Sequence, residues 1–156
     1  MFHIILYAPQ IPPNTGNIIR LSANTGAQLH LIEPLGFRLD AKACRRAGLD
    51  YHAVADVHLH KSLDDCTKTL SLARFFVITS HGTKSLFDQK FIAGDAFLFG
   101  SETAGLPRSI HARFNAEKKL RLPMIAGNRS LNLANAASIV VYEAWRQTGF
   151  ASGGKG

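Results

Sequence analysis

Three polar segments of this sequence carry residue types that could do chemistry, and the first is PPNTGNIIR, residues 12–20. Asn14 and Asn17 offer amide donors and acceptors, and Arg20 lies three residues after Asn17, on the same face of a helix. A guanidinium there suits a phosphate group or a nucleic-acid backbone. Taken alone, the segment is more simply interpreted as a capped helix with an exposed arginine.

The second segment, FGSETAGLP at residues 99–107, places Glu102 on a loop framed by Gly100 and Gly105. The glycines allow positive φ or a close approach of the backbone to a ligand. The loop has neither the Gly-x-Gly-x-x-Gly fingerprint nor Gly-Lys-Ser/Thr, so a dinucleotide site and a P-loop do not fit. Taken alone, a tight turn with a solvated glutamate is the simpler interpretation.

The third segment, PMIAGNRSLNLANAASIVVYE at residues 123–143, ends in a helix that is apolar over most of its circumference. Such a helix must be covered on more than one side, which in a small chain predicts a second subunit. One polar stripe is expected on it, made of Asn132, Asn135, Ser138 and Tyr142. The stripe either caps neighbouring loops or faces a ligand. Arg129 adds positive charge before the helix N-terminus, where an anion is already favoured.

Other reactive side chains give weaker signals. His58 and His60 share a strand face, but no carboxylate or thiol nearby in sequence completes a metal site, so we expect no metal. Cys44 and Cys66 have no Cys-x-x-Cys spacing and are interpreted as free thiols. The Gly-x-Ser-x-Gly motif of serine hydrolases is absent.

The elements that must position these segments alternate along the chain between short apolar runs and helix-like stretches. The expected strands are 2–8, 27–33, 53–59, 74–80, 95–100 and 119–123. The expected helices begin at Asn14, Asp40, Ser62, Pro107 and Ser130 and end near Gly26, Gly48, Leu72, Phe114 and Gly149. The alternation predicts an α/β fold with a mostly parallel sheet and helices on both faces.

In such sheets, ligands bind at loops that leave the carboxyl ends of strands. Four polar loops directly follow expected strands, namely PPNTGN, TSHG, GSETAGLP and PMIAGNRS. We therefore expect these loops to converge on one edge of the sheet.

Composition limits the partners. The 156 residues suffice for one domain with a real core, and a net charge of +7 favours a polyanion such as nucleic acid, although a solubility charge is an equal alternative. No apolar run could span a bilayer and no signal peptide begins the chain, so a cytoplasmic protein without membrane contact is expected.

Together, PPNTGNIIR, FGSETAGLP and LPMIAGNRSLNLANAASIVVYE resemble, in order and spacing, the three motifs of the SPOUT family of RNA methyltransferases. The resemblance covers essentially the whole chain. It is strongest to the smallest branch, which methylates the ribose 2′-hydroxyl of cytidine or modified uridine at the wobble position, nucleotide 34, of leucine tRNAs. A guanine-N1 branch usually carries a different acidic residue and a longer C-terminal domain, which this chain lacks.

The resemblance implies a single methyltransferase domain at residues 1–150, a flexible tail at 151–156 and a C-terminal deep trefoil knot. It implies a homodimer packed through the first and last helices, with Tyr142 at the seam. S-adenosylmethionine would be held in the knot, mostly by backbone groups. The residues implied to bind this cofactor are Ile78, Gly100, Leu122, Ser130 and Leu131.

The resemblance also implies roles at the reacting hydroxyl. Arg20 would lie nearest its proton, Asn14 would orient the nucleotide, and Glu102 would order the site or Arg20. Because arginine stays protonated, Arg20 is better suited to stabilising the developing alkoxide than to acting as a base. Arg20, Arg121 and Arg129 would bind the anticodon stem-loop of tRNA. Alternatives are a 2′-O-methyltransferase for another tRNA or rRNA site, and a non-catalytic knotted RNA-binding protein.

Overall fold

The computed structural model describes residues 1–39, 57–128 and 130–151. Within these ranges, seven strands form one sheet in the order β3-β2-β1-β6-β4-β7-β5, and every adjacent pair is parallel. The strands are β1 (His3–Tyr7), β2 (Gln28–Ile32), β3 (Val57–His60), β4 (Phe75–Ile78), β5 (Lys84–Ser85), β6 (Ala96–Phe99) and β7 (Lys119–Arg121). The predicted α/β class with a parallel sheet is confirmed.

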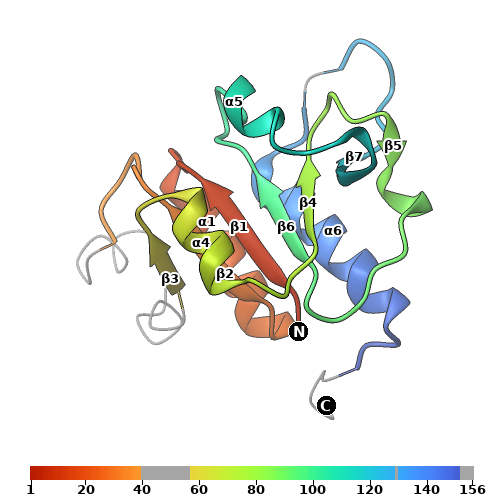
Figure 1. Cartoon of the computed structure of the whole chain (residues 1–156), viewed down its shortest axis with the longest axis horizontal. Coiled ribbons are helices and arrows are strands. Elements are labelled where there is room, and N and C mark those ends of the chain that lie inside the picture. The colour runs from red at the N-terminus through yellow and green to blue at the C-terminus, as the bar shows by residue number, and fades with distance from the viewer. Residues whose placement is uncertain (40–56, 129, 152–156) are drawn as a thin grey trace.

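The helices fall on both faces of this sheet (Figure 1). They are α1 (Pro12–Thr25), α4 (Leu63–Thr69), α5 (Arg108–His111) and α6 (Leu133–Gln147), with short 3-10 turns η1 (Leu86–Asp88) and η2 (Ala116–Lys118). Side chains of α1 and α6 pack in one buried cluster, and those of α4 and α5 in another. Strand alternation explains this division, since Ile4 faces α1 and α6 while Ile5 faces α4.

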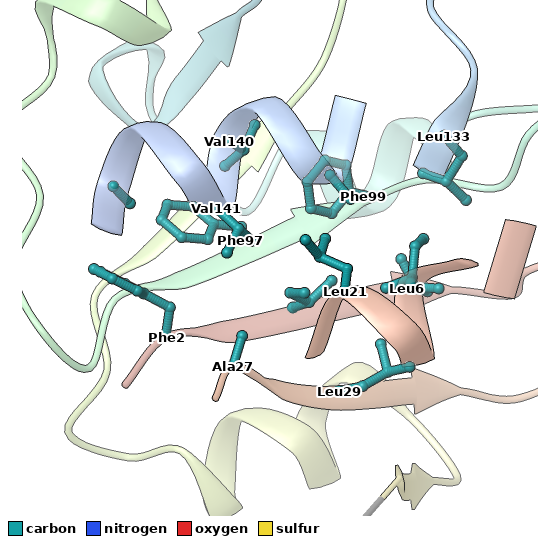
Figure 2. Packing of buried hydrophobic residues seen from close by; sticks show 14 of the residues in the cluster. Phe2, Leu6, Leu21, Ala27, Leu29, Phe97, Phe99, Leu133, Val140 and Val141 are labelled. Carbon is teal, nitrogen blue, oxygen red and sulfur yellow. The ribbon is translucent and has the colours of Figure 1, made fainter. Parts of the chain in front are cut away.

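The larger cluster of buried hydrophobic side chains packs α1 and α6 against the central strands (Figure 2). Phe97 and Phe99 of β6 lie against Val140 and Val141 of α6, and none of the four side chains is more than 2% exposed. Burying a side chain of this size contributes about 1.5–3 kcal/mol. The two helices that carry the first and third motifs are therefore held rigidly on the same face of the sheet.

Each predicted strand is present, although strand 53–59 is described only from residue 57 onwards. The two-residue β5 was not predicted, because its neighbours show no periodic pattern. Helix α1 ends as expected at Gly26, which adopts φ 71°. The expected helix at 40–48 and all of the expected tail except Ala151 lie outside the described residues.

Two predicted helix starts are wrong. Helix α1 begins at Pro12 after the capping position Ile11, because the fixed φ of proline suits the first helical turn, and Asn14 lies inside the helix. Helix α6 begins at Leu133, because the side chain of Asn132, and not of Ser130, accepts hydrogen bonds from the backbone N–H groups of residues 134 and 135.

The two shorter helices agree in part. Ser62 caps α4 by accepting a hydrogen bond from the Asp65 N–H, but the helix stops at Thr69, before the expected Leu72. Pro107 is the capping residue of α5 and precedes its first turn. Within the described ranges, no helix is both long and apolar enough to cross a membrane.

Candidate functional site

The four predicted loops, which follow β1, β4, β6 and β7, meet at the carboxyl edge of the sheet, where they line one cavity of about 510 Å³. All five residues expected to bind the cofactor line it, namely Ile78, Gly100, Leu122, Ser130 and Leu131. Asn14 and Glu102 line it as well. Convergence of the loops is therefore confirmed. A cavity of this size matches the range of small-molecule and cofactor sites.

The loop after β6 closes on itself at the cavity wall. The backbone N–H of Ser101 donates to the Gly105 carbonyl at 3.2 Å, and the Gly105 N–H donates to the Ser101 carbonyl at 3.0 Å. Gly105 has φ 67°, in the left-handed region. A Cβ on Gly100 would lie 2.3 Å from the Gly105 carbonyl carbon and 2.4 Å from the Leu106 nitrogen. Only glycine at position 100 permits this closed loop, which exposes backbone groups to the cavity.

Glu102 of this loop reaches the N-terminus of α1. Its carboxylate accepts hydrogen bonds from the backbone N–H groups of Gln10, at 2.8 Å, and Ile11, at 3.0 Å. Helix α1 has no side-chain cap and no acidic residue in its first turn. Glu102 therefore supplies from a distant loop the negative charge that a helix N-terminus favours. The carboxylate therefore holds the 100–105 loop to the start of α1, whereas the loop sequence taken alone predicted a solvated side chain.

Asn14 connects the first and third motifs. Its amide Nδ2 donates to Glu102 Oε1 at 3.2 Å, and its Oδ1 accepts from Asn132 Nδ2 at 2.8 Å. Asn14 is only 6% exposed, so these bonds fix its orientation. Because Asn132 also caps α6, one chain of hydrogen bonds joins the 100–105 loop to the starts of α1 and α6. The sequence signalled Asn132 only as part of a stripe.

The predicted basic residues are not all brought to the cavity. Arg20 is exposed on α1 and does not line the cavity, because six helical residues place it about 9 Å along the axis from Asn14 and on a different side. Arg121 is exposed at the end of β7, next to the lining residue Leu122. Arg129 lies outside the described residues.

Two histidines that the sequence did not single out also line the cavity. His81 and His111 come from the loop after β4 and from α5, with ring centroids 6.4 Å apart. Burial lowers the pKa of His111, and the nearby positive charge of Lys119 lowers it further. His111 is thus a neutral imidazole at pH 7 and can accept or donate a hydrogen bond.

The predicted stripe on α6 divides into separate roles. Asn132 caps the helix, and Ser138 donates to the Ala134 carbonyl at 2.8 Å. Asn135 and Tyr142 are exposed together with Ile139, which is 38% exposed. The capping alternative is therefore correct for Asn132, whereas Asn135 and Tyr142 lie on an exposed face of α6 that also contains the apolar Ile139.

A separate group of histidines lies on the other face of the sheet, under α4. His30 of β2 faces His3 of β1, with 3.2 Å between ring nitrogens, and His60 of β3, with 2.9 Å. Burial lowers the pKa of His30 to about 3, assisted by the neighbouring histidines, and also lowers the pKa values of His3 and His60. Burial raises the pKa of the neighbouring Cys66 thiol to about 12. No sequence pattern connects these residues, because they come from four different elements.

Comparison with known proteins places this arrangement in a family. The SpoU rRNA Methylase family matches residues 1–142. A tRNA (cytidine(34)-2'-O)-methyltransferase from Burkholderia ambifaria is 56% identical over 155 residues, covering 98% of this chain and 99% of the relative.

Solved structures agree with these similarities. One, which concerns the 2-OH methylation of C/U34 on tRNA, is 45% identical, has a TM-score of 0.87 and covers 96% of this chain and 97% of its own. The SpoU methyltransferase AviRb from Streptomyces viridochromogenes, in complex with the cofactor AdoMet, is 26% identical with a TM-score of 0.79. That match covers 94% of this chain and 57% of AviRb.

Proposed function

Because this chain belongs to the SpoU rRNA methylase family, we propose that it transfers a methyl group from S-adenosylmethionine to the ribose 2′-hydroxyl of nucleotide 34 in tRNA. The observation that carries the proposal is 56% identity, over nearly the full length of both chains, to a tRNA (cytidine(34)-2'-O)-methyltransferase. The nucleotide is a cytidine or a modified uridine. The motif resemblance narrows the substrate further, to leucine tRNAs.

The cavity fits the proposed methyl donor. Its walls combine the apolar side chains of Ile78, Leu122 and Leu131 with the backbone of the closed 100–105 loop. Apolar walls suit an adenine ring, and backbone amides and carbonyls suit its edge. When bound, the donor supplies an electrophilic methyl group on a sulfonium. The protein then has to position the hydroxyl and ease the loss of its proton.

Asn14 and Glu102 serve this reaction mainly by position. Two of the bonding groups of the Asn14 amide are committed to Glu102 and Asn132, which leaves one amide hydrogen and one lone pair for the nucleotide. Glu102 holds the donor loop against α1. Asn14 therefore orients the ribose, and Glu102 orders the wall beside it.

Arg20 acts on the hydroxyl as a fixed positive charge that stabilises the developing alkoxide. Since Arg20 does not line the cavity of its own chain, it serves the cavity of a second copy. A homodimer packed through α1 and α6 provides this arrangement. Exposed apolar residues on or beside these helices support such a dimer, namely Ile11, Leu131, Ile139 and Tyr142.

The remaining parts of the proposal concern fold and substrate. The C-terminal part forms a deep trefoil knot, an exception to the near-absence of knots in proteins, supported by the likeness to SpoU structures. Arg20, Arg121 and Arg129 bind the anticodon stem-loop, supported by the net charge of +7. A cytoplasmic location follows from the tRNA substrate.

The reaction is tested with purified protein, S-adenosylmethionine and total tRNA from a strain that lacks the gene. Nuclease digestion and mass spectrometry should reveal a new 2′-O-methylated nucleoside that maps to position 34 of leucine tRNAs. A product that maps to another tRNA site would refute the substrate. Cofactor binding without any ribose methylation of tRNA would point to ribosomal RNA or to a base as the target, whereas neither binding nor product would leave a non-catalytic RNA-binding protein.

The role of Arg20 is tested by mixing two inactive variants. Arg20→Ala keeps an intact cavity, and Gly100→Val keeps Arg20 but obstructs its own loop. If Arg20 acts on the partner's cavity, co-expressed chains should recover about a quarter of wild-type activity, since half of the dimers are mixed and each has one complete site. Mixtures that stay inactive, although mixed dimers are isolated, would place Arg20 in its own chain's site.

A further inference from the structure

The histidine group under α4 contains three potential metal ligands that come from three different elements. His30 of β2, His60 of β3 and Cys66 of α4 are all buried, and one ligand atom from each lies within 4.8 Å of the others. None of the three lines the cavity of the candidate active site. We expected no metal because no ligand lies near His58 and His60 in the sequence. In the folded chain, however, the Cys66 thiol and the His30 imidazole lie next to His60.

The types of donor select a class of ion. Two imidazole nitrogens and one thiolate form a soft to borderline set that suits zinc and disfavours magnesium and calcium, which prefer oxygen. Among the residues that the structure describes, no carboxylate joins this group of ligands. Three protein ligands leave a fourth position for water or a small ligand.

The geometry requires only side-chain adjustments. His30 Nδ1 and His60 Nε2 already face each other at 2.9 Å. Tetrahedral zinc would hold two nitrogens about 3.3 Å apart and a nitrogen and sulfur about 3.6 Å apart. The imidazoles must therefore separate by a few tenths of an ångström, and the thiol must approach by up to about 1 Å. Metal binding would replace the hydrogen bond between the rings.

We propose that His30, His60 and Cys66 form a zinc-binding site, separate from the methyltransferase cavity, that links α4 to β2 and β3. On binding, two imidazole nitrogens and the Cys66 sulfur coordinate the ion, and the thiol proton passes to the buffer. The sheet edge gains a cross-link where packing by the seven-residue α4 is modest. The ligands do not take part in the proposed methyl transfer, because they lie on the opposite face of the sheet from α1 and α6.

Neighbouring histidines restrict the movement of the His30 ring, and one of them is exposed to solvent, from which an ion would arrive. His58, on the edge strand β3, is exposed and stacks on His30 with ring centroids 4.8 Å apart. His3 holds the opposite side of His30 through its ring nitrogen at 3.2 Å. The ring of His30 is thus held between two neighbours, which reduces the conformational entropy lost when an ion binds.

The test uses the full-length protein, stripped of metal with a chelator, and two probes, zinc chloride and cobalt chloride. Isothermal titration should show one zinc ion per chain, and zinc should raise the melting temperature. Cobalt should give the intense visible bands of a tetrahedral site and a near-ultraviolet charge-transfer band from a thiolate. The cobalt measurement on unaltered protein needs no variant to fold.

Cys66→Ser should remove the charge-transfer band and lower zinc affinity at least tenfold, and His60→Ala should lower that affinity similarly. His81→Ala, on the wall of the separate cavity, is the matched imidazole control for His60→Ala and should bind zinc as wild type. Circular dichroism of the metal-free variants checks that they fold. Failure of the unaltered protein to bind zinc, or a charge-transfer band that survives Cys66→Ser, would overturn the proposal and leave a hydrogen-bonded row of histidines.

Discussion

Replacing Glu102 should weaken both the fold and the donor cavity, because its carboxylate is the hydrogen-bond acceptor for the start of α1. Oε2 accepts from the Gln10 N–H, and Oε1 accepts from the Ile11 N–H and from Asn14 Nδ2. Glu102→Ala removes all three bonds and the charge at the helix N-terminus. Glu102→Gln keeps one oxygen and turns an amide NH₂ toward a backbone N–H.

The magnitude follows from these contacts. A hydrogen bond to a charged group contributes about 1.5–3 kcal/mol when buried, but this site is partly exposed, so about 1 kcal/mol for each bond is appropriate. Glu102→Ala should therefore lower the free energy of unfolding by about 3 kcal/mol, and Glu102→Gln by about 1.5 kcal/mol. In a domain of this size, the melting temperature should fall by about 9 °C for alanine and by about half as much for glutamine.

Urea unfolding and thermal melting monitored by circular dichroism measure the stability, and calorimetric titration with S-adenosylhomocysteine measures the cavity. Glu117→Gln is the matched control, since the Glu117 side chain is 80% exposed and makes only a 3.6 Å ion pair with Lys84. It should change the stability by less than about 0.5 kcal/mol. The reasoning is refuted if Glu102→Ala unfolds within 0.5 kcal/mol of wild type or binds the ligand equally well.

Three further outcomes are expected. Gly100→Ala should abolish ligand binding in calorimetry, because its Cβ would lie 2.3 Å from a backbone atom. The Cβ of Gly105→Ala would meet nothing within 4 Å, so this variant should lose only about 1–2 kcal/mol of stability to positive-φ strain. An equal loss of ligand binding in the two variants would contradict this. Arg74→Ala should lower stability by about 3 kcal/mol in urea titrations, since it strips two 2.7 Å bonds from buried Asp95. Arg113→Ala, which breaks an ion pair with Asp64 whose two side chains are both exposed, should have little effect. Filter-binding affinity for tRNA should fall steeply between low and moderate salt, and a flat response would argue against phosphate contacts.

Sequence patterns predicted the sheet and the meeting of the loops because both depend on local regularities. Buried apolar runs such as 95–100 mark strands, and polar loops that follow parallel strands must share an edge. Helix starts were less predictable. Asn14 and Asn132 are both suitable capping residues. Because Pro12 and Pro13 favour the first helical turn, however, α1 starts before Asn14, whose side chain bonds to Asn132 and does not cap the helix.

Hydrogen bonds between residues far apart in the chain could not be predicted from the sequence, because no local pattern requires them. The bonds from Glu102 to residues 10, 11 and 14 span about 90 positions, and nothing local to either segment requires them. The histidine group has the same character, since its members come from β1, β2, β3 and α4. Even the direct pairing of His30 with His58 in parallel strands depends on a register that is known only from the structure.

The hydrogen-bonded chain from Glu102 through Asn14 to Asn132 explains why three distant motifs occur together. Each motif contributes one member: Glu102 binds backbone N–H groups at the start of α1, Asn132 caps α6, and Asn14 joins these two side chains. Removing Glu102 or Asn132 leaves the buried Asn14 amide without one of its two partners, so the energetic effects of substitutions at Asn14 and its partners should couple. The double variant Asn14→Ala/Glu102→Ala should therefore be less destabilised than the sum of the single variants, by about 0.5–1 kcal/mol. Strict additivity in urea unfolding would mean that the loop and the two helices are positioned independently, by the sheet alone.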